Sequence, residues 1–141
     1  EFATIAAQML WRLWEPPRLE PAVVKAIEET QSADHIIISS FNPLALSRVR
    51  RLNPQLPRGL LYFKELPIFL GNAWLRPLAR PHALHPRNPM VTSAYMEWAN
   101  RGSYAINAWT VDDPIEARRL AELGVNAIIT NQPEVLRDAL R

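Results

Sequence analysis

Short apolar runs alternate with amphipathic stretches along most of this chain. One pattern occurs three times: a run of mostly β-branched residues, an Asn or Asp close to a proline, and a segment with one apolar side. A capping side chain next to a proline is a typical helix start. Each copy therefore predicts a short buried strand followed by a helix. The copies span residues 36–52, 105–123 and 127–140.

Weaker signals of the same kind fill the rest of the chain. Residues 59–63 and 83–86 have the apolar character of strands, and helices are predicted at 19–30 and 92–101. The five strand starts lie roughly 22 to 24 residues apart, which fits a strand, a helix and two loops. Continuously apolar strands favour a parallel sheet that helices cover.

Five such units could form an open doubly wound sheet or one side of a barrel. The regular spacing favours the barrel, although a complete barrel of eight units takes about 250 residues. We therefore predict an α/β fold: a partial (β/α) TIM-type barrel of about five parallel strands with returning helices.

Two segments fall outside this regular pattern. Residues 5–14 are apolar on most sides, which predicts an apolar N-terminal helix buried against this domain, a second copy or a membrane surface. We leave residues 1–18 unassigned as this helix and a linker, and assign 19–141 to the partial barrel. The irregular stretch 63–80 is predicted to form a lid or side wall of a pocket, or a short helix that contacts a membrane or a partner.

Composition narrows the possible functions of the 141 residues. There is no cysteine, which excludes disulfides, thiol nucleophiles and zinc–thiolate sites in this chain. The net charge of +2 is too small to predict nucleic-acid binding. No apolar run reaches the about 20 residues of a membrane-spanning helix, and no basic residue precedes the first apolar run as in a signal peptide. We expect a cytoplasmic protein without a transmembrane segment.

Three short segments of the sequence, here called phrases, carry a resemblance to a known family. They are Ile-Ser-Ser-Phe-Asn-Pro-Leu-Ala-Leu at 38–46, Asn-Ala-Trp-Thr-Val-Asp-Asp-Pro at 107–114 and Leu-Gly-Val-Asn-Ala-Ile-Ile-Thr-Asn-Gln-Pro at 123–133. Together they resemble the C-terminal half of a glycerophosphodiester phosphodiesterase barrel, over roughly residues 19–141. Asp112, Ala127 and Asn131 depart from the family's usual Asn, Gly and Asp at these positions.

The resemblance implies an enzyme that hydrolyses glycerophosphodiesters to an alcohol and sn-glycerol 3-phosphate, usually with a divalent metal, Ca or Mg. In this family the acid/base histidines and the metal carboxylates lie in earlier His-Arg-Gly and Glu-x-Lys phrases, which this chain lacks. We therefore expect no catalytic residue and no metal ligand here, and no activity from this fragment alone. The alternative is a non-catalytic half-barrel that serves as a binding or assembly module.

The resemblance also suggests three substrate-binding residues. Trp109 follows a predicted strand, where barrel active sites are built, and corresponds to the tryptophan that lines the glycerol pocket. Phe41 occupies the equivalent place after its own strand, and His85 ends another strand and could contact a phosphate. The alternatives are an aromatic side chain packed under a loop, a core phenylalanine and a capping histidine. A metal pair of His82 and His85 is disfavoured by the flanking prolines.

Charged residues of the second phrase and of two helices have ordinary structural explanations. Asp112 and Asp113 could bind a metal, but Pro114 follows directly, so helix capping is favoured for at least one of them. The arginines of the two helices are expected to face solvent; they are Arg48, Arg50, Arg51, Arg118 and Arg119.

A half-barrel leaves two strand edges unpaired and exposes side chains meant for the barrel interior. We therefore predict that the chain is a homo-oligomer or associates with a missing N-terminal half.

Overall fold

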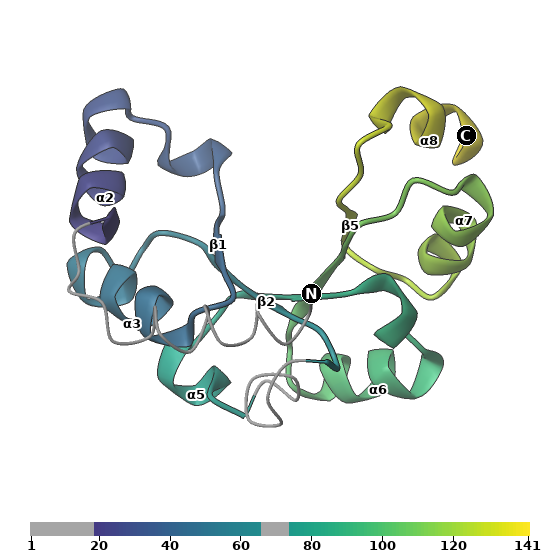
Figure 1. The fold of residues 1–141 in the computed structure, drawn as a ribbon, viewed down its shortest axis with the longest axis horizontal. Helices are drawn as coiled ribbons and strands as arrows, with labels where there is room; N and C mark the ends of the chain where they lie inside the picture. Colours follow the sequence, from purple (N-terminus) through teal and green to yellow (C-terminus); the bar gives the residue numbers. More distant parts are fainter. Residues whose placement is uncertain (1–18, 66–73) are drawn as a thin grey trace. The chain divides into compact units, whose positions relative to one another are not determined.

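The computed structural model describes residues 19–65 and 74–141, and the chain divides into a first unit that ends at His82 and a second unit, Ala83–Arg141. Each unit repeats the order of strand and helix along the chain (Figure 1). The N-terminal helix predicted at 5–14 lies outside the described residues. So does the middle of the stretch 63–80, whose last part forms a short helix.

Within its described residues, the first unit contains two parallel strands, a helix that precedes them and the helices that follow each strand. Its helices and strands are α2 (Leu19–Thr30), β1 (Ile38–Ser40), α3 (Pro43–Leu52), β2 (Arg58–Tyr62) and α5 (Arg76–Ala79). In the register of the two strands, Ile38 lies opposite Arg58. Helix α3 packs against both α2 and α5 (Figure 1). The core is a cluster of aliphatic side chains, mainly Val24, Ile27, Val49 and Leu56.

The second unit contains three strands in the parallel order β3-β4-β5. Its helices and strands are β3 (Ala83–Pro86), α6 (Ser93–Arg101), β4 (Ala105–Ala108), α7 (Pro114–Glu122), β5 (Ala127–Ile128) and α8 (Pro133–Ala139). Helices α7 and α8 lie beside one another (Figure 1). Leu84, Ile106 and Leu120 are fully buried and form the centre of this unit.

Two of the three helix starts predicted from the repeated pattern follow it. The side chains of Asn42 and Asp113 accept backbone N–H groups at the starts of α3 and α7, each directly before a proline. At the start of α8 the position before Pro133 is Gln132, whose side chain makes no capping hydrogen bond. The predicted cap, Asn131, lies one residue too early because Gln132 intervenes.

Of the five arginines expected in solvent, Arg48 and Arg119 form ion pairs, and Arg118 donates to the carbonyl of Ala139. Arg48 of α3 forms an ion pair with Glu20 of α2, with 2.6 Å between Nη2 and Oε1, and both side chains are largely buried. Arg119 pairs with Glu116.

The prediction that α7 has one apolar, buried side is only partly correct, because Ile115 is 75% exposed while Ala117 and Leu120 are buried. Residue 115 lies about 200° around the helix from residue 117, on the far side.

Arg58, within β2, is a buried cation that binds backbone carbonyls. Its Nη1 donates to the carbonyls of Pro54 and Leu56, and its Nη2 donates to that of Arg80. Burial, with a smaller contribution from the charge of Arg50, lowers the pKa of Arg58. One side chain thus joins the loop before β2 to the end of α5.

The first and last strands are the least covered. Strands β2 and β3 are almost completely buried, whereas β1 and β5 are partly exposed. Within the described residues, no helix is long and apolar enough to cross a bilayer.

Candidate functional site

Trp109 lies directly after β4 and is joined to the end of β3 at three points. Its indole Nε1 donates to the carbonyl of His85 at 2.6 Å. Its backbone N–H donates to the carbonyl of Pro86 at 3.2 Å, and its own carbonyl accepts from the N–H of Asn88 at 2.8 Å. Because the side chain and the backbone are both held, the ring of Trp109 has a defined position at the carboxyl ends of these strands.

His85 lies beneath this arrangement, with only 1% of its surface exposed. Its Nε2 accepts a hydrogen bond of 3.0 Å from Nδ2 of Asn107, on the adjacent strand β4. Burial disfavours the charged imidazolium and lowers the pKa of His85. The ring is therefore neutral at neutral pH. The structure brings His85 and Trp109 together.

Phe41 belongs to the first unit, where it follows β1. Its ring packs edge to face against Phe63, with the ring centroids 5.8 Å apart and the planes at 88°. The side chain is only partly buried. The residue thus has the strand-end position that the sequence predicted and retains an accessible surface.

His82 has a structural contact rather than a metal-binding geometry. Its Nδ1 accepts a hydrogen bond of 3.3 Å from the backbone N–H of Arg58. Burial, followed by the positive charge of Arg58, lowers the pKa of His82. Across residues 19–65 and 74–141, no group of three or more His, Asp or Glu side chains could hold a metal ion. This part of the chain does not fit the divalent metal that the family resemblance implies.

Asp112 and Asp113 have different tasks. Asp113 caps α7 by accepting the N–H of Ile115 at 3.1 Å. Asp112 accepts the hydroxyl of Thr130 and both the backbone and side-chain N–H groups of Asn131, at 2.8 to 2.9 Å. The two bonds from Asn131, followed by the one from Thr130, lower the pKa of Asp112. Asp112 therefore joins the loop after β4 to the loop after β5.

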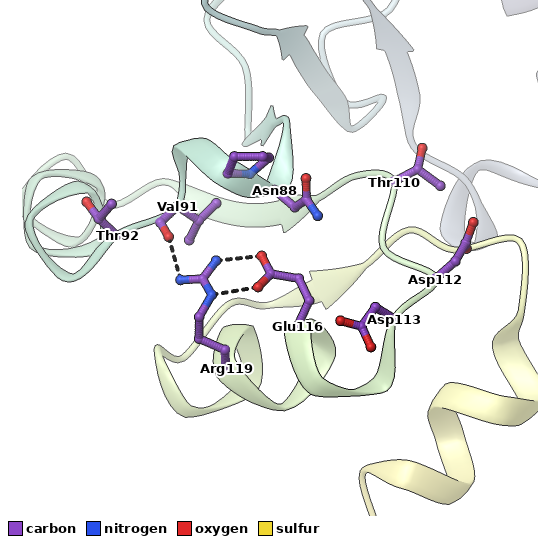
Figure 2. A pocket seen from close by; sticks show the side chains of 9 residues that line it. Asn88, Val91, Thr92, Thr110, Asp112, Asp113, Glu116 and Arg119 are labelled. Carbon is purple, nitrogen blue, oxygen red and sulfur yellow. Dashed lines mark hydrogen bonds and ion pairs between the residues drawn. The ribbon is translucent and has the colours of Figure 1, made fainter.

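A cavity of about 650 Å³ opens beside these loops (Figure 2). Figure 2 shows the guanidinium of Arg119 facing the carboxylate of Glu116 and the carbonyl of Val91. Nε and Nη2 of Arg119 each donate to one carboxylate oxygen of Glu116 at 2.7 Å, and Nη1 donates to the carbonyl of Val91 at 2.9 Å. The lining residues are Asn88, Pro89, Val91, Thr92, Thr110, Asp112, Asp113, Glu116 and Arg119. The cavity offers hydroxyl, amide and carboxylate groups for hydrogen bonding to a polar ligand, and its arginine is already paired.

Sequence reasoning missed two features of this region. The first is Asn107, which lies two residues before Trp109 and therefore on the same face of β4. That period of two could have drawn attention to it. The second is the Glu116–Arg119 pair, which follows the three-residue spacing of neighbours on a helix. Its contact with Val91 is long-range and has no local signal.

Parallel strands that alternate with helices, with an aromatic side chain at a strand's carboxyl end, agree with the predicted (β/α) barrel. Solved structures confirm this predicted fold class. A glycerophosphoryl diester phosphodiesterase structure from Silicibacter pomeroyi matches 86% of this chain and 43% of its own, with a TM-score of 0.77 and 25% identity. A phosphodiesterase structure from Oleispira antarctica matches 86% and 49% respectively, with a TM-score of 0.69 and 21% identity.

The family follows from the sequence comparison. The model of the glycerophosphoryl diester phosphodiesterase family matches residues 8–135. This chain belongs to that family, as its three phrases predicted. A glycerophosphodiester phosphodiesterase of Caldanaerobacter subterraneus subsp. tengcongensis is 32% identical over 126 residues, which are 89% of this chain and 50% of the relative. The protein YqiK of Bacillus subtilis is 26% identical over 118 residues, 82% of this chain and 47% of its own. The chain spans about half the length of these two relatives.

Proposed function

We propose that this chain forms the C-terminal half of the barrel of a phosphodiesterase that hydrolyses glycerophosphodiesters to an alcohol and sn-glycerol 3-phosphate. The observation that carries the proposal is the fixed position of Trp109 at a strand's carboxyl end, in a chain of this family. Two relatives support it. The protein of Caldanaerobacter is named a glycerophosphodiester phosphodiesterase, and the Oleispira structure contains the product sn-glycerol-3-phosphate.

In this proposal Trp109, Phe41 and His85 belong to the substrate-binding wall. An indole ring offers a flat apolar surface to the carbon atoms of a glycerol unit, and its position is already fixed before substrate arrives. Phe41 serves the same purpose at the end of β1. His85 is neutral and buried, and it supports the wall by accepting the indole N–H of Trp109 at its backbone carbonyl.

The acid, base and metal-binding groups are proposed to come from residues other than those described. Hydrolysis of a phosphodiester needs groups that move protons and stabilise the charge on phosphorus. Asp112 and Asp113 are taken up by Thr130, Asn131 and the start of α7, so they are poor candidates for either task. A divalent ion, Ca or Mg, would supply charge stabilisation at the phosphate in the complete enzyme.

We further propose that the partly exposed strands β1 and β5 are completed by another part of the protein, the N-terminal half, or by a second copy of the chain. Ile37 next to β1 and Ile129 next to β5 are both exposed. Exposed apolar side chains beside a partly exposed strand favour the addition of a further strand.

The test is an assay of the complete protein with glycerophosphocholine and either Ca²⁺ or Mg²⁺, following the release of sn-glycerol 3-phosphate. We expect turnover, and a W109A variant with a KM raised about tenfold, because the apolar contact of one aromatic ring is lost. N100D, an exposed change on α6, is the matched control and should leave both constants unaltered. Failure of the complete protein to turn over with either metal would contradict the proposal and favour the non-catalytic module.

A further inference from the structure

Asn107 and Trp109 contact the same residue of the neighbouring strand. They lie two positions apart, so both side chains leave β4 on one face. Nδ2 of Asn107 reaches the imidazole of His85 at 3.0 Å, and Nε1 of Trp109 reaches the carbonyl of His85 at 2.6 Å. One residue at the end of β3 is thus held by its ring and by its backbone.

The chemistry of the amide fixes the state of the imidazole. The nitrogen of an asparagine side chain can only donate, so Nε2 of His85 must accept and carries no proton. Burial lowers the pKa of His85, which keeps the ring neutral. A neutral imidazole without a proton on Nε2 has it on Nδ1. The contact therefore selects one tautomer and one ring orientation.

Stability alone does not generally require a polar pair at a buried position. Replacing two hydrogen-bonded buried groups by apolar groups of similar shape is often neutral or stabilising, whereas leaving one of them unpaired is costly. A hydrogen bond between side chains does, however, specify one arrangement where apolar packing allows several. The Asn107–His85 pair is thus suited to fixing a geometry at the place where Trp109 is attached.

We propose that Asn107 is a positioning residue of the substrate-binding wall: it holds His85 in one orientation as the neutral Nδ1–H tautomer, and His85 in turn holds the indole of Trp109. The part of this inference that concerns substrate rests on the proposed function. The part that concerns His85 and Trp109 does not.

The first test is nitrogen-15 NMR of the complete protein, with the His85 signals assigned by their loss in an H85Q variant. We expect the wild-type ring to be neutral, with Nδ1 protonated and Nε2 accepting. In N107D the carboxylate can only accept, so the proton must move to Nε2 or the ring must become charged. N100D is the matched control and should leave the tautomer unchanged. An Nε2–H tautomer in the wild-type protein, which needs no variant to observe, would overturn the inference.

The second test separates positioning from folding through kinetics. N107L removes the donor but keeps a side chain of similar size. We expect its KM for glycerophosphocholine to rise about fivefold, the effect of one hydrogen bond, with little change in kcat. In a W109L background the same change should have no further effect on KM, because both act through the indole. Equal, independent effects of N107L in the two backgrounds would overturn the link to Trp109.

The two tests also distinguish the inference from the proposed function. Should the complete protein have no phosphodiesterase activity, the proposed function fails, while the tautomer and the indole N–H signal in N107L still decide the positioning role. We expect that indole signal to shift in N107L and to stay constant in N100D. An indole signal unaltered in N107L would contradict the positioning role even in an active enzyme.

Discussion

Asn42 and Gln132 occupy the same place, directly before the proline at the start of a helix, yet only Asn42 caps its helix. Oδ1 of Asn42 accepts the N–H groups of Leu44 and Ala45 at 2.9 and 3.3 Å. Changing Asn42 to Ala should lower the free energy of unfolding by about 1 kcal/mol, the usual effect of losing an N-cap. Urea denaturation measures this difference.

The control for that experiment is Q132A. Gln132 makes no side-chain capping bond, so its removal should change the free energy of unfolding by less than about 0.3 kcal/mol. Equal losses in the two variants would show that proline at the first helical position, rather than the cap, sets the stability of these helix starts.

Asp112 gives the stability a dependence on pH. Hydrogen bonds from Asn131 and Thr130 lower its pKa in the folded state relative to the unfolded state. A lowered pKa means that the charged form stabilises the fold above the unfolded value, about 3.9, and that this contribution is lost as the pH falls through the folded value. Between pH 7 and pH 2, wild type should therefore lose more stability than D112N, as measured by melting temperature against pH. Parallel curves for the two proteins would contradict this assignment.

At the scale of residues, the sequence predicted the roles that depend on neighbouring residues and missed the hydrogen bonds to residues far along the chain. Asn42 and Asp113 precede prolines, and both cap helices as the pattern predicted. Capping was expected of at least one of Asp112 and Asp113. The contacts of Asp112 were missed because nothing local shows that its partners lie 18 and 19 residues further on. The contact of Asn107 with His85 likewise spans 22 residues.

At the scale of elements, an ion pair joins helices α2 and α3. Arg48 of α3 and Glu20 of α2 have side chains that are 18% and 11% exposed. Charged hydrogen bonds in such partly buried places are worth more than surface pairs, because water screens them less. E20Q should therefore lower the free energy of unfolding by about 1.5 kcal/mol. Urea denaturation again measures the effect.

Helix α2 also provides the matched control. Lys25 and Glu29 form a pair 3.6 Å apart whose side chains are 75% and 65% exposed. E29Q should change stability by less than about 0.5 kcal/mol, as exposed pairs usually do. A similar loss in both variants would show that burial does not strengthen the pair of Glu20 and Arg48.

The elements themselves were largely predictable. The predicted helix at 19–30 is α2, and the one predicted at 92–101 is α6, preceded by its capping residue Thr92. Gly124, with φ of +82°, follows α7 as the left-handed stop expected from the sequence. Strands β2 and β3 have the lengths of their predicted runs, whereas β1, β4 and β5 are shorter than theirs. Strand β4 ends at Ala108, but Trp109 continues the pairing as a single bridge with Arg87.

At the scale of the whole molecule, the partly exposed strands β1 and β5 predict association. At about 25 cal/mol per Å², a few hundred Å² of apolar surface left in water costs several kcal/mol, which is comparable to the stability of a small domain. Light scattering of a polypeptide limited to these 141 residues should therefore show particles heavier than 16.1 kDa at micromolar concentration. A 16.1 kDa particle with a cooperative melt would contradict the prediction.

The sequence indicated a barrel rather than an open sheet through its regular spacing, and the matched structures confirm that choice. The sequence predicts association less directly than it predicts the barrel. The pattern of apolar residues is similar in covered and uncovered strands, so it does not say what lies beyond β1 and β5. Trp109 could be predicted as a site residue because its place after a strand and its sequence phrase agree. Its hydrogen bond to the carbonyl of His85, at the end of β3, could be found only in the structure.

Arg58 joins the loop before β2 to the end of α5, and this contact affects the conditions under which this part of the protein is stable. Many small domains join distant backbone segments through disulfides, whose survival depends on the surroundings. Here a guanidinium performs that task by donating to three carbonyls, and the 141 residues contain no cysteine. A guanidinium keeps its proton at every pH at which proteins fold, and no oxidant or reductant alters it under physiological conditions. Dithiothreitol and oxidised glutathione should leave the melting temperature of these residues the same, so we expect this part of the protein to be equally stable in reducing and oxidising environments.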